Sequence, residues 1–169
     1  MLTPEGLATL LSGYVQQSGS AVDLLLVGGL AVQAYGDAQR FTHDVAGEVR
    51  GDLEGLVRFL HSHQIPADLG EDLSRWSVVA MPPGYRDRAT VMTERPGLRI
   101  RILHPTDFVT AKLRRGTEVD LGDAAFVARR FGVTAAAVRA AAEDAVQASP
   151  RDTAIFLFRT TVEQFCTRL

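Results

Sequence analysis

The stretch VDLLLVGGLAVQAYGDAQRFTHDVAGE, residues 22–48, decides the fold. Its first part, residues 22–27, is short, apolar and bounded by turn residues, which predicts a buried strand. Gly28-Gly29 ends that strand, and residues 30–35 are predicted to form a helix that ends at Gly36. Residues 41–49 are predicted to form a second strand. A strand, a glycine turn, a helix and another strand predict an α/β arrangement.

The segments on either side continue this mixture of strands and helices. Helices are predicted over residues 3–18, 53–63, 105–115, 120–131, 134–148 and 152–167, and strands over residues 76–81, 88–92 and 98–103. The last third of the chain is therefore expected to be helical. We expect an α/β (α+β) fold with a mixed sheet flanked by helices. Its expected domains are residues 1–131 and a helical extension, residues 132–169, packed on the first.

The composition restricts the function classes. The chain has 169 residues, of which 46% are hydrophobic and 22% charged, and its net charge is −2, so its surface as a whole is not that of a cationic nucleic-acid binder. Its one cysteine, Cys166, excludes an internal disulfide and favours a reducing compartment. The N-terminal residues do not resemble a signal peptide, and no apolar run approaches the roughly 18 residues of a membrane span. We expect a cytoplasmic protein without a membrane partner.

The stretch 27–48 also holds residue types that suit a nucleotide. Glycines between a strand and a helix let the backbone approach a phosphate, and N–H groups at a helix N-terminus favour an anion. We therefore expect Gly28 and Gly29 to bind phosphate, with Arg40 gripping a phosphate oxygen and Thr42 beside it. Asp44 suits Mg²⁺. Taken singly, Thr42 is an ordinary strand residue and Asp44 a surface acid or cap.

Together, the patterns G-G-x-A and R-x-T-x-D resemble the first motif of the small bacterial nucleotidyltransferase-fold proteins. That group includes abortive-infection toxins of two-gene toxin–antitoxin systems and several uncharacterised relatives. The resemblance extends over residues 22–131. Its downstream part rests on the following residues: Pro82-Pro83-Gly84-Tyr85, Arg88, His104-Pro105-Thr106-Asp107-Phe108, Lys112-Leu113, Asp120 and Asp123.

The resemblance implies a nucleotidyltransferase-like fold and transfer of a nucleotide from a nucleoside triphosphate to RNA or to a protein hydroxyl. It also implies a possible antitoxin partner, and Mg²⁺ held by two carboxylates in an Asp-x-Asp pattern. In this chain it assigns Asp44, Lys112 and Asp120 to catalysis, with Lys112 neutralising phosphate charge. Alternatives remain open: Lys112 as a solvated side chain, and Asp120 and Asp123 as helix caps, with capping preferred for Asp123.

The sequence departs from this pattern at Ala46, where the second acid is expected. Side chains two residues apart on a strand point the same way, so both acids of the pattern would reach one metal. Ala46 has no ligand atom. Glu48, on the same face but about 13 Å from position 44 in a regular strand, is the candidate for the second metal ligand if its longer side chain or a β-bulge closes that gap. Arg99 and Arg101 offer no replacement and are expected to be solvated, with phosphate or RNA contact as the alternative.

Three hypotheses follow: a nucleotidyltransferase, a nucleotide-binding protein without catalysis, and an interaction module on the same fold. Alanine at position 46 fits natural loss of the metal ligand and an inactivating substitution equally well.

Overall fold

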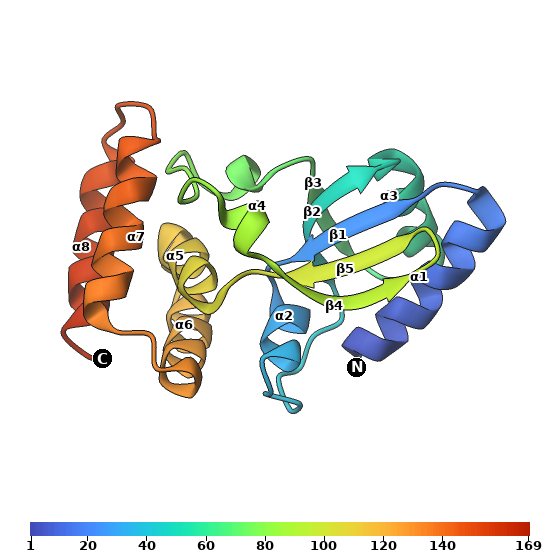
Figure 1. Cartoon of the computed structure of the whole chain (residues 1–169), viewed down its shortest axis with the longest axis horizontal. Helices are drawn as coiled ribbons and strands as arrows, with labels where there is room; N and C mark the ends of the chain where they lie inside the picture. Colours follow the sequence, from blue (N-terminus) through green and yellow to red (C-terminus); the bar gives the residue numbers. More distant parts are fainter. The chain divides into compact units, whose positions relative to one another are not determined.

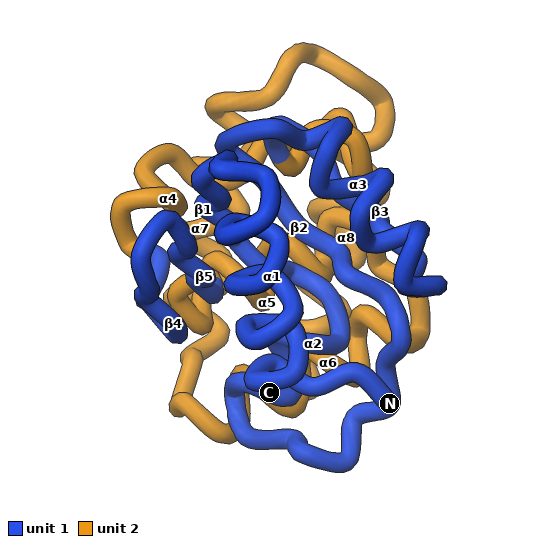
Figure 2. The backbone as a smooth tube through the Cα atoms, turned by 90° about the vertical axis from the view of Figure 1, so that its right-hand side faces the viewer, with its two compact units in different colours: residues 1–72, 89–102 blue, residues 73–88, 103–169 orange.

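The computed structural model describes all residues, 1–169. The chain folds as two compact units (Figure 2). The first consists of residues 1–72 and 89–102, and the second of residues 73–88 and 103–169. The boundary expected at residue 131 stays a prediction. None of the helices combines the length and the apolar composition needed to span a membrane.

The first unit is built on a five-stranded mixed sheet in the order β3-β2-β1-β5-β4 (Figure 1). The central strand β1 pairs antiparallel with β2 and parallel with β5, while β3 is parallel to β2 and β4 antiparallel to β5. The strands are β1 (Val22–Leu26), β2 (Val45–Gly51), β3 (Ala67–Gly70), β4 (Thr90–Arg95) and β5 (Leu98–Ile102). The expected mixed sheet flanked by helices is confirmed.

Three helices belong to the first unit: α1 (Pro4–Ser18), α2 (Gly29–Ala34) and α3 (Leu53–Ser62). Helix α1 begins as its sequence predicts, because the Thr3 side chain accepts a hydrogen bond from the Gly6 N–H and Pro4 occupies the first turn. The rings of Tyr14 and Phe59, with centroids 4.8 Å apart, join α1 to α3.

The two faces of the sheet differ in character. Leu24 and Ile100 lie on one face and are fully buried. Arg95 is on this same face, and its guanidinium donates to Ser12 on α1, so α1 covers this apolar side. The strand register places the charged residues on the other face: Asp23, Glu48, Arg50, Arg99 and Arg101.

The second unit is helical. Its elements are a 3₁₀ turn (Leu73–Trp76) and helices α4 (Tyr85–Arg88), α5 (Pro105–Arg115), α6 (Glu118–Phe131), α7 (Ala135–Gln147) and α8 (Ala154–Cys166). Helix α5 packs closely on α6, and α7 on α8. The expected helical C-terminal part is confirmed.

Two strand predictions are wrong. Residues 76–81 form no strand, because an arginine binds two of their carbonyls: Arg114 donates to the carbonyl of Val79 at 2.7 Å and to that of Ser77 at 3.5 Å. The second strand begins at Val45, not at residue 41, because the Thr42 hydroxyl bonds the Asp44 carboxylate and the chain bends there. Strand β3 was not expected.

Candidate functional site

The glycine turn, Gly28-Gly29, follows β1 and leads into α2, as expected. A Cβ built on Gly28 lies 2.9 Å from the Cβ of Ala46, and one built on Gly29 lies 2.8 Å from the Cβ of Thr42. Both distances are shorter than real Cβ contacts. A side chain at either position would force its neighbour to shift, and the turn therefore packs closely against the segment that carries Asp44.

Asp44 lies in the bend before β2 and is partly exposed. The hydroxyl of Thr42, a residue that is only 4% exposed, donates to Oδ1 of Asp44 at 2.7 Å. This bond fixes the orientation of the carboxylate. Thr42 therefore acts on Asp44 directly, whereas its predicted contact with a nucleotide stays a prediction.

The loop that carries Arg40 is held by a residue that sequence reasoning missed. The Gln33 side chain on α2 is buried, and its Nε2 donates to the carbonyls of Arg40 at 2.7 Å and Leu2 at 3.1 Å. The Leu2 N–H in turn donates to the Thr42 carbonyl at 3.0 Å. No signal in the sequence marks Gln33, because a glutamine within a short helix is an ordinary residue. Arg40 itself donates to the Phe41 carbonyl at 3.0 Å.

The residues around position 46 do not fit a magnesium site. Ala46 is buried on β2, against Gly28, and supplies no ligand atom. Glu48 is 1% exposed and lies opposite Leu25 of β1, in the interior of the sheet. The chain contains no group of three or more His, Cys, Asp or Glu side chains placed to hold a metal ion. Asp44 is thus a single carboxylate at the glycine turn.

The arginines of β5 are paired. The Nε of Arg101 donates to Asp23 at 2.9 Å, and the Arg101 side chain is 11% exposed, so the expectation that it is solvated is wrong. The carboxylate of Asp23, on the neighbouring strand β1, holds the Arg101 side chain in place. Arg99 is half exposed and donates to Glu94 at 2.8 Å, and this hydrogen bond raises the pKa of Arg99.

In the second unit, Lys112 is the centre of a buried ion cluster. Its Nζ donates to Asp120 at 3.1 Å and to Asp123 at 3.0 Å, and all three side chains are less than one-tenth exposed. The alternative of a solvated Lys112 is therefore wrong. Arg115 adds a contact to Asp120 at 3.2 Å. The positive charge of Lys112 is balanced within its own unit.

Asp120 and Asp123 differ in their place on α6. Thr117 caps the helix: its hydroxyl accepts from the Asp120 N–H at 3.2 Å and donates to the Asp120 carboxylate at 2.6 Å. Asp123 lies further along the helix, so its expected capping role is wrong. Burial raises the pKa of Asp120, but the Thr117 hydroxyl and the Lys112 ammonium outweigh it, and the net pKa lies below its usual value.

Two further segments of the predicted pattern come together in the second unit. Arg88 donates from Nε and Nη2 to the two oxygens of Asp107, at 2.8 and 2.9 Å, and from Nη1 to the Pro83 carbonyl at 2.9 Å. The Asp107 side chain is 2% exposed, so this two-pronged bond is well shielded. It raises the pKa of Arg88 and ties the Pro-Pro-Gly loop to the start of α5.

Asp44 belongs to the first unit, and Lys112 and Asp120 belong to the second. The contacts of Asp44, and those of Lys112 and Asp120, are thus described within their own units. The joint catalytic role expected for the three residues stays a prediction.

One of three comparisons with known proteins finds a family for this chain. No curated protein and no solved structure matches the chain. Residues 7–131 match the model of a family described as nucleotidyltransferase of unknown function, DUF6036. This region contains the whole sheet, the glycine turn and the cluster around Lys112. The chain therefore belongs to the DUF6036 family of nucleotidyltransferases.

Proposed function

We propose that the chain binds a nucleoside triphosphate at the glycine turn and that its transfer of a nucleotide to RNA or protein is slow or absent as long as position 46 is alanine. Membership of the nucleotidyltransferase family supports the choice of a triphosphate. The close approach of position 46 to Gly28 carries the proposal, because a carboxylate at that position would lie beside the turn.

The glycine turn suits a phosphate chain. Gly28 has an extended backbone, with φ −92° and ψ −153°, and precedes the first turn of α2. Backbone N–H groups at the start of a helix favour an anion, and the absence of side chains at both glycines leaves the main chain accessible. Arg40, in the following loop, would add a positive charge for the phosphates.

The carboxylates limit what the bound triphosphate can do. Transfer of this kind depends on positioning and on stabilisation of developing charge. A pair of carboxylates would hold and orient magnesium for that purpose. Here the pair is reduced to Asp44, held by Thr42, while Glu48 is buried between neighbouring strands. The residues present therefore support binding better than transfer.

The test is to restore the second carboxylate. In the Ala46→Asp variant, transfer of labelled nucleotide to an RNA and protein extract should rise on the order of a hundredfold, the effect of one well-placed charge-stabilising group. Ala140→Asp, at an exposed position of α7, is the matched control for an added charge. Asp44→Asn in the Ala46→Asp background should remove the gain.

Binding is measured separately by calorimetry with each of the four triphosphates. Binding without transfer in the Ala46→Asp variant would leave a nucleotide-binding protein without catalysis. Absence of both would overturn the proposal and favour an interaction module.

The toxin–antitoxin setting belongs to the same proposal and rests on the motif resemblance. It predicts that expression of the Ala46→Asp variant slows growth of the host, whereas the chain with Ala46 and the Ala140→Asp control do not. Growth that is equal for all three, with transfer restored in vitro, would separate the enzyme from a toxin role.

A further inference from the structure

An open groove of about 350 Å³ lies in the first unit, at the end of the sheet where β1 begins. Its charged lining residues are Asp23, Arg50, Glu94, Arg95 and Arg99. The strand register sets four of them in a single row across β2, β1, β5 and β4: Arg50 pairs with Asp23, Asp23 with Arg99, and Arg99 with Glu94. Three arginines therefore surround one groove.

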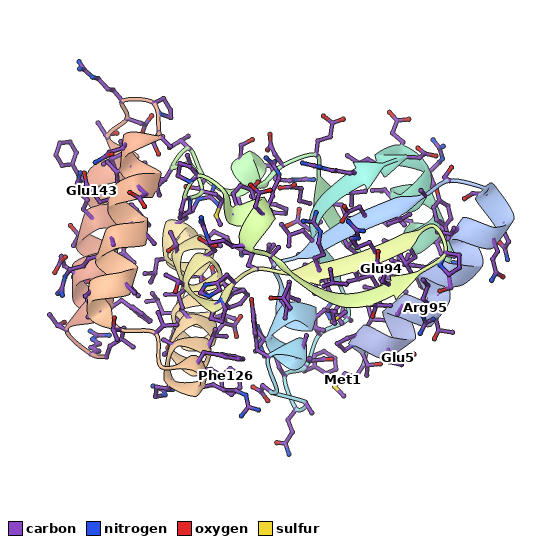
Figure 3. The ribbon with its side chains drawn as sticks, viewed as in Figure 1. Met1, Glu5, Glu94, Arg95, Phe126 and Glu143 are labelled. Carbon is purple, nitrogen blue, oxygen red and sulfur yellow. The ribbon has the colours of Figure 1, made fainter.

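All but one of these charges are balanced. Glu94 binds Arg99 at 2.8 Å, Asp23 binds Arg101 at 2.9 Å, and Arg95 binds Glu5 at 2.7 Å. Figure 3 shows Glu94 and Arg95 on β4 with Glu5 on α1. Arg50 is exposed, and its side chain makes no hydrogen bond or ion pair within the chain. The groove therefore carries one positive charge without a partner, beside the partly exposed guanidinium of Arg99.

We propose that this groove binds a phosphate group of a nucleic-acid strand, with Arg50 and Arg99 as the cations that hold it. A guanidinium offers planar paired donors that match two oxygens of a phosphate. At the rim, Gly51 and Gly97 have φ of +131° and +71°, and both lack a side chain that would cover the backbone. The groove thus presents positive charge without steric obstruction.

The position of the groove favours a strand over a free anion. Arg50 and Ala46 lie on the same face of β2. They are four residues apart, which is about 13 Å in a regular strand. Four helically stacked nucleotides, at a rise of roughly 3.4 Å each along the helix axis, span a similar distance. A strand whose reactive end lies at the glycine turn would therefore bring a later phosphate to Arg50. This inference rests on the proposed function, in which the nucleic-acid strand is the acceptor of the transferred nucleotide.

The experiment measures binding of a fluorescent single-stranded RNA by anisotropy over a series of salt concentrations. The Arg50→Ala variant should bind about three- to tenfold more weakly, and its salt slope should fall by about one unit, as for loss of one phosphate contact. Arg50→Lys should recover part of the loss. Arg58→Ala is the matched control, because Arg58 is a 73% exposed arginine on α3. Its affinity should equal that of the wild type.

Other outcomes overturn the inference. Equal losses for Arg50→Ala and Arg58→Ala would indicate general charge attraction. If inorganic phosphate or pyrophosphate binds the wild type as tightly as the RNA, and Arg50→Ala removes both, the groove takes free anions and the strand is excluded. Failure here is separable from failure of the proposed function. Arg50-dependent RNA binding without transfer by Ala46→Asp contradicts only the latter, and transfer that does not depend on Arg50 contradicts only the former.

Discussion

The cluster around Lys112 and the glycine turn differ in how far their charged groups are paired within the chain. Lys112 donates to two carboxylates within 3.1 Å, and one of them, Asp120, also accepts from the Thr117 hydroxyl. Asp44 at the glycine turn is held by one hydroxyl, at 2.7 Å, and its neighbour at position 46 has no polar atom. The first group is saturated with internal partners, whereas the second retains capacity for a ligand.

This difference shows why burial and function separate in the molecule. A buried ion cluster is stable only when every charge is paired, because an unpaired charge away from water is costly. A binding site needs the reverse: groups that are oriented but not fully satisfied. By this criterion the Lys112 cluster stabilises its unit, whereas the partly exposed Asp44 fits the proposed role of a ligand-binding group.

The largest expected effect comes from removing the cation of the Lys112 cluster. Lys112→Met leaves Asp120 and Asp123 buried without their common cation. It should lower the free energy of unfolding by about 3–5 kcal/mol, the usual result of removing one partner of a buried ion pair. Denaturant unfolding measures it.

Arg115→Met is the control, since that side chain is 43% exposed and forms an ion pair with Asp120 alone. Its loss should be under about 1 kcal/mol. Equal losses for the two variants would show that Lys112 is not the centre of the cluster.

The glycine turn can be disrupted by a single methyl group. Gly29→Ala places a Cβ 2.8 Å from that of Thr42, so the strain should cost about 1–3 kcal/mol in thermal or denaturant unfolding. Gly13→Ala on α1 is the matched control, because a Cβ there has no neighbour within 4 Å. It should stabilise the chain by about 0.5–1 kcal/mol. A neutral Gly29→Ala would contradict the close packing of the turn on Thr42.

Variants of Thr42 test whether its hydroxyl orients Asp44 for binding at the glycine turn. Thr42→Val keeps the shape but removes the donor to Asp44, and should cost about 1 kcal/mol of stability and weaken triphosphate binding. Thr42→Ser keeps the hydroxyl and should bind like the wild type. Calorimetric titration distinguishes the two variants. Equal binding by both would show that the hydroxyl does not orient Asp44.

The smallest effect is a dependence on pH. The folded-state pKa of Asp120 lies below its usual value, so its ionised form adds stability above the ordinary carboxylate range. That contribution is lost as the pH falls through the folded-state pKa. As the pH is lowered through the acid range, the free energy of unfolding should therefore fall less steeply in Asp120→Asn than in the wild type. An identical slope would show that Asp120 is not stabilised by Thr117 and Lys112.

The sequence predicted those elements whose ends carry strong local signals. Helix α5 begins at Pro105 and ends before Gly116, as expected, because its proline and its left-handed glycine act locally. Strand β1 was also found, since an apolar run between turns has few other structures.

The misses arose where a distant side chain decided the structure. Residues 76–81 look like a strand, yet Arg114 binds the Val79 carbonyl in place of a neighbouring strand. Strand β3, with the sequence ADLG, lacks the β-branched residues that mark a strand. In the candidate site, the glycine turn and Asp44 were identified, but Gln33 and the partners of Lys112 were not, because such pairings depend on the folded chain.

The division of the chain into units has a consequence for the order in which the protein folds during synthesis. The polypeptide passes from one unit to the other three times, after residues 72, 88 and 102. Strand β1 cannot acquire its parallel partner until β5 has been made, more than 70 residues later. Residues 73–88 are made before that moment, yet Arg88 must wait for Asp107 and the Val79 carbonyl for Arg114. The strands of the sheet are therefore complete before the partners of residues 73–88 have been made, and a chain stopped at residue 102 would carry that segment without them.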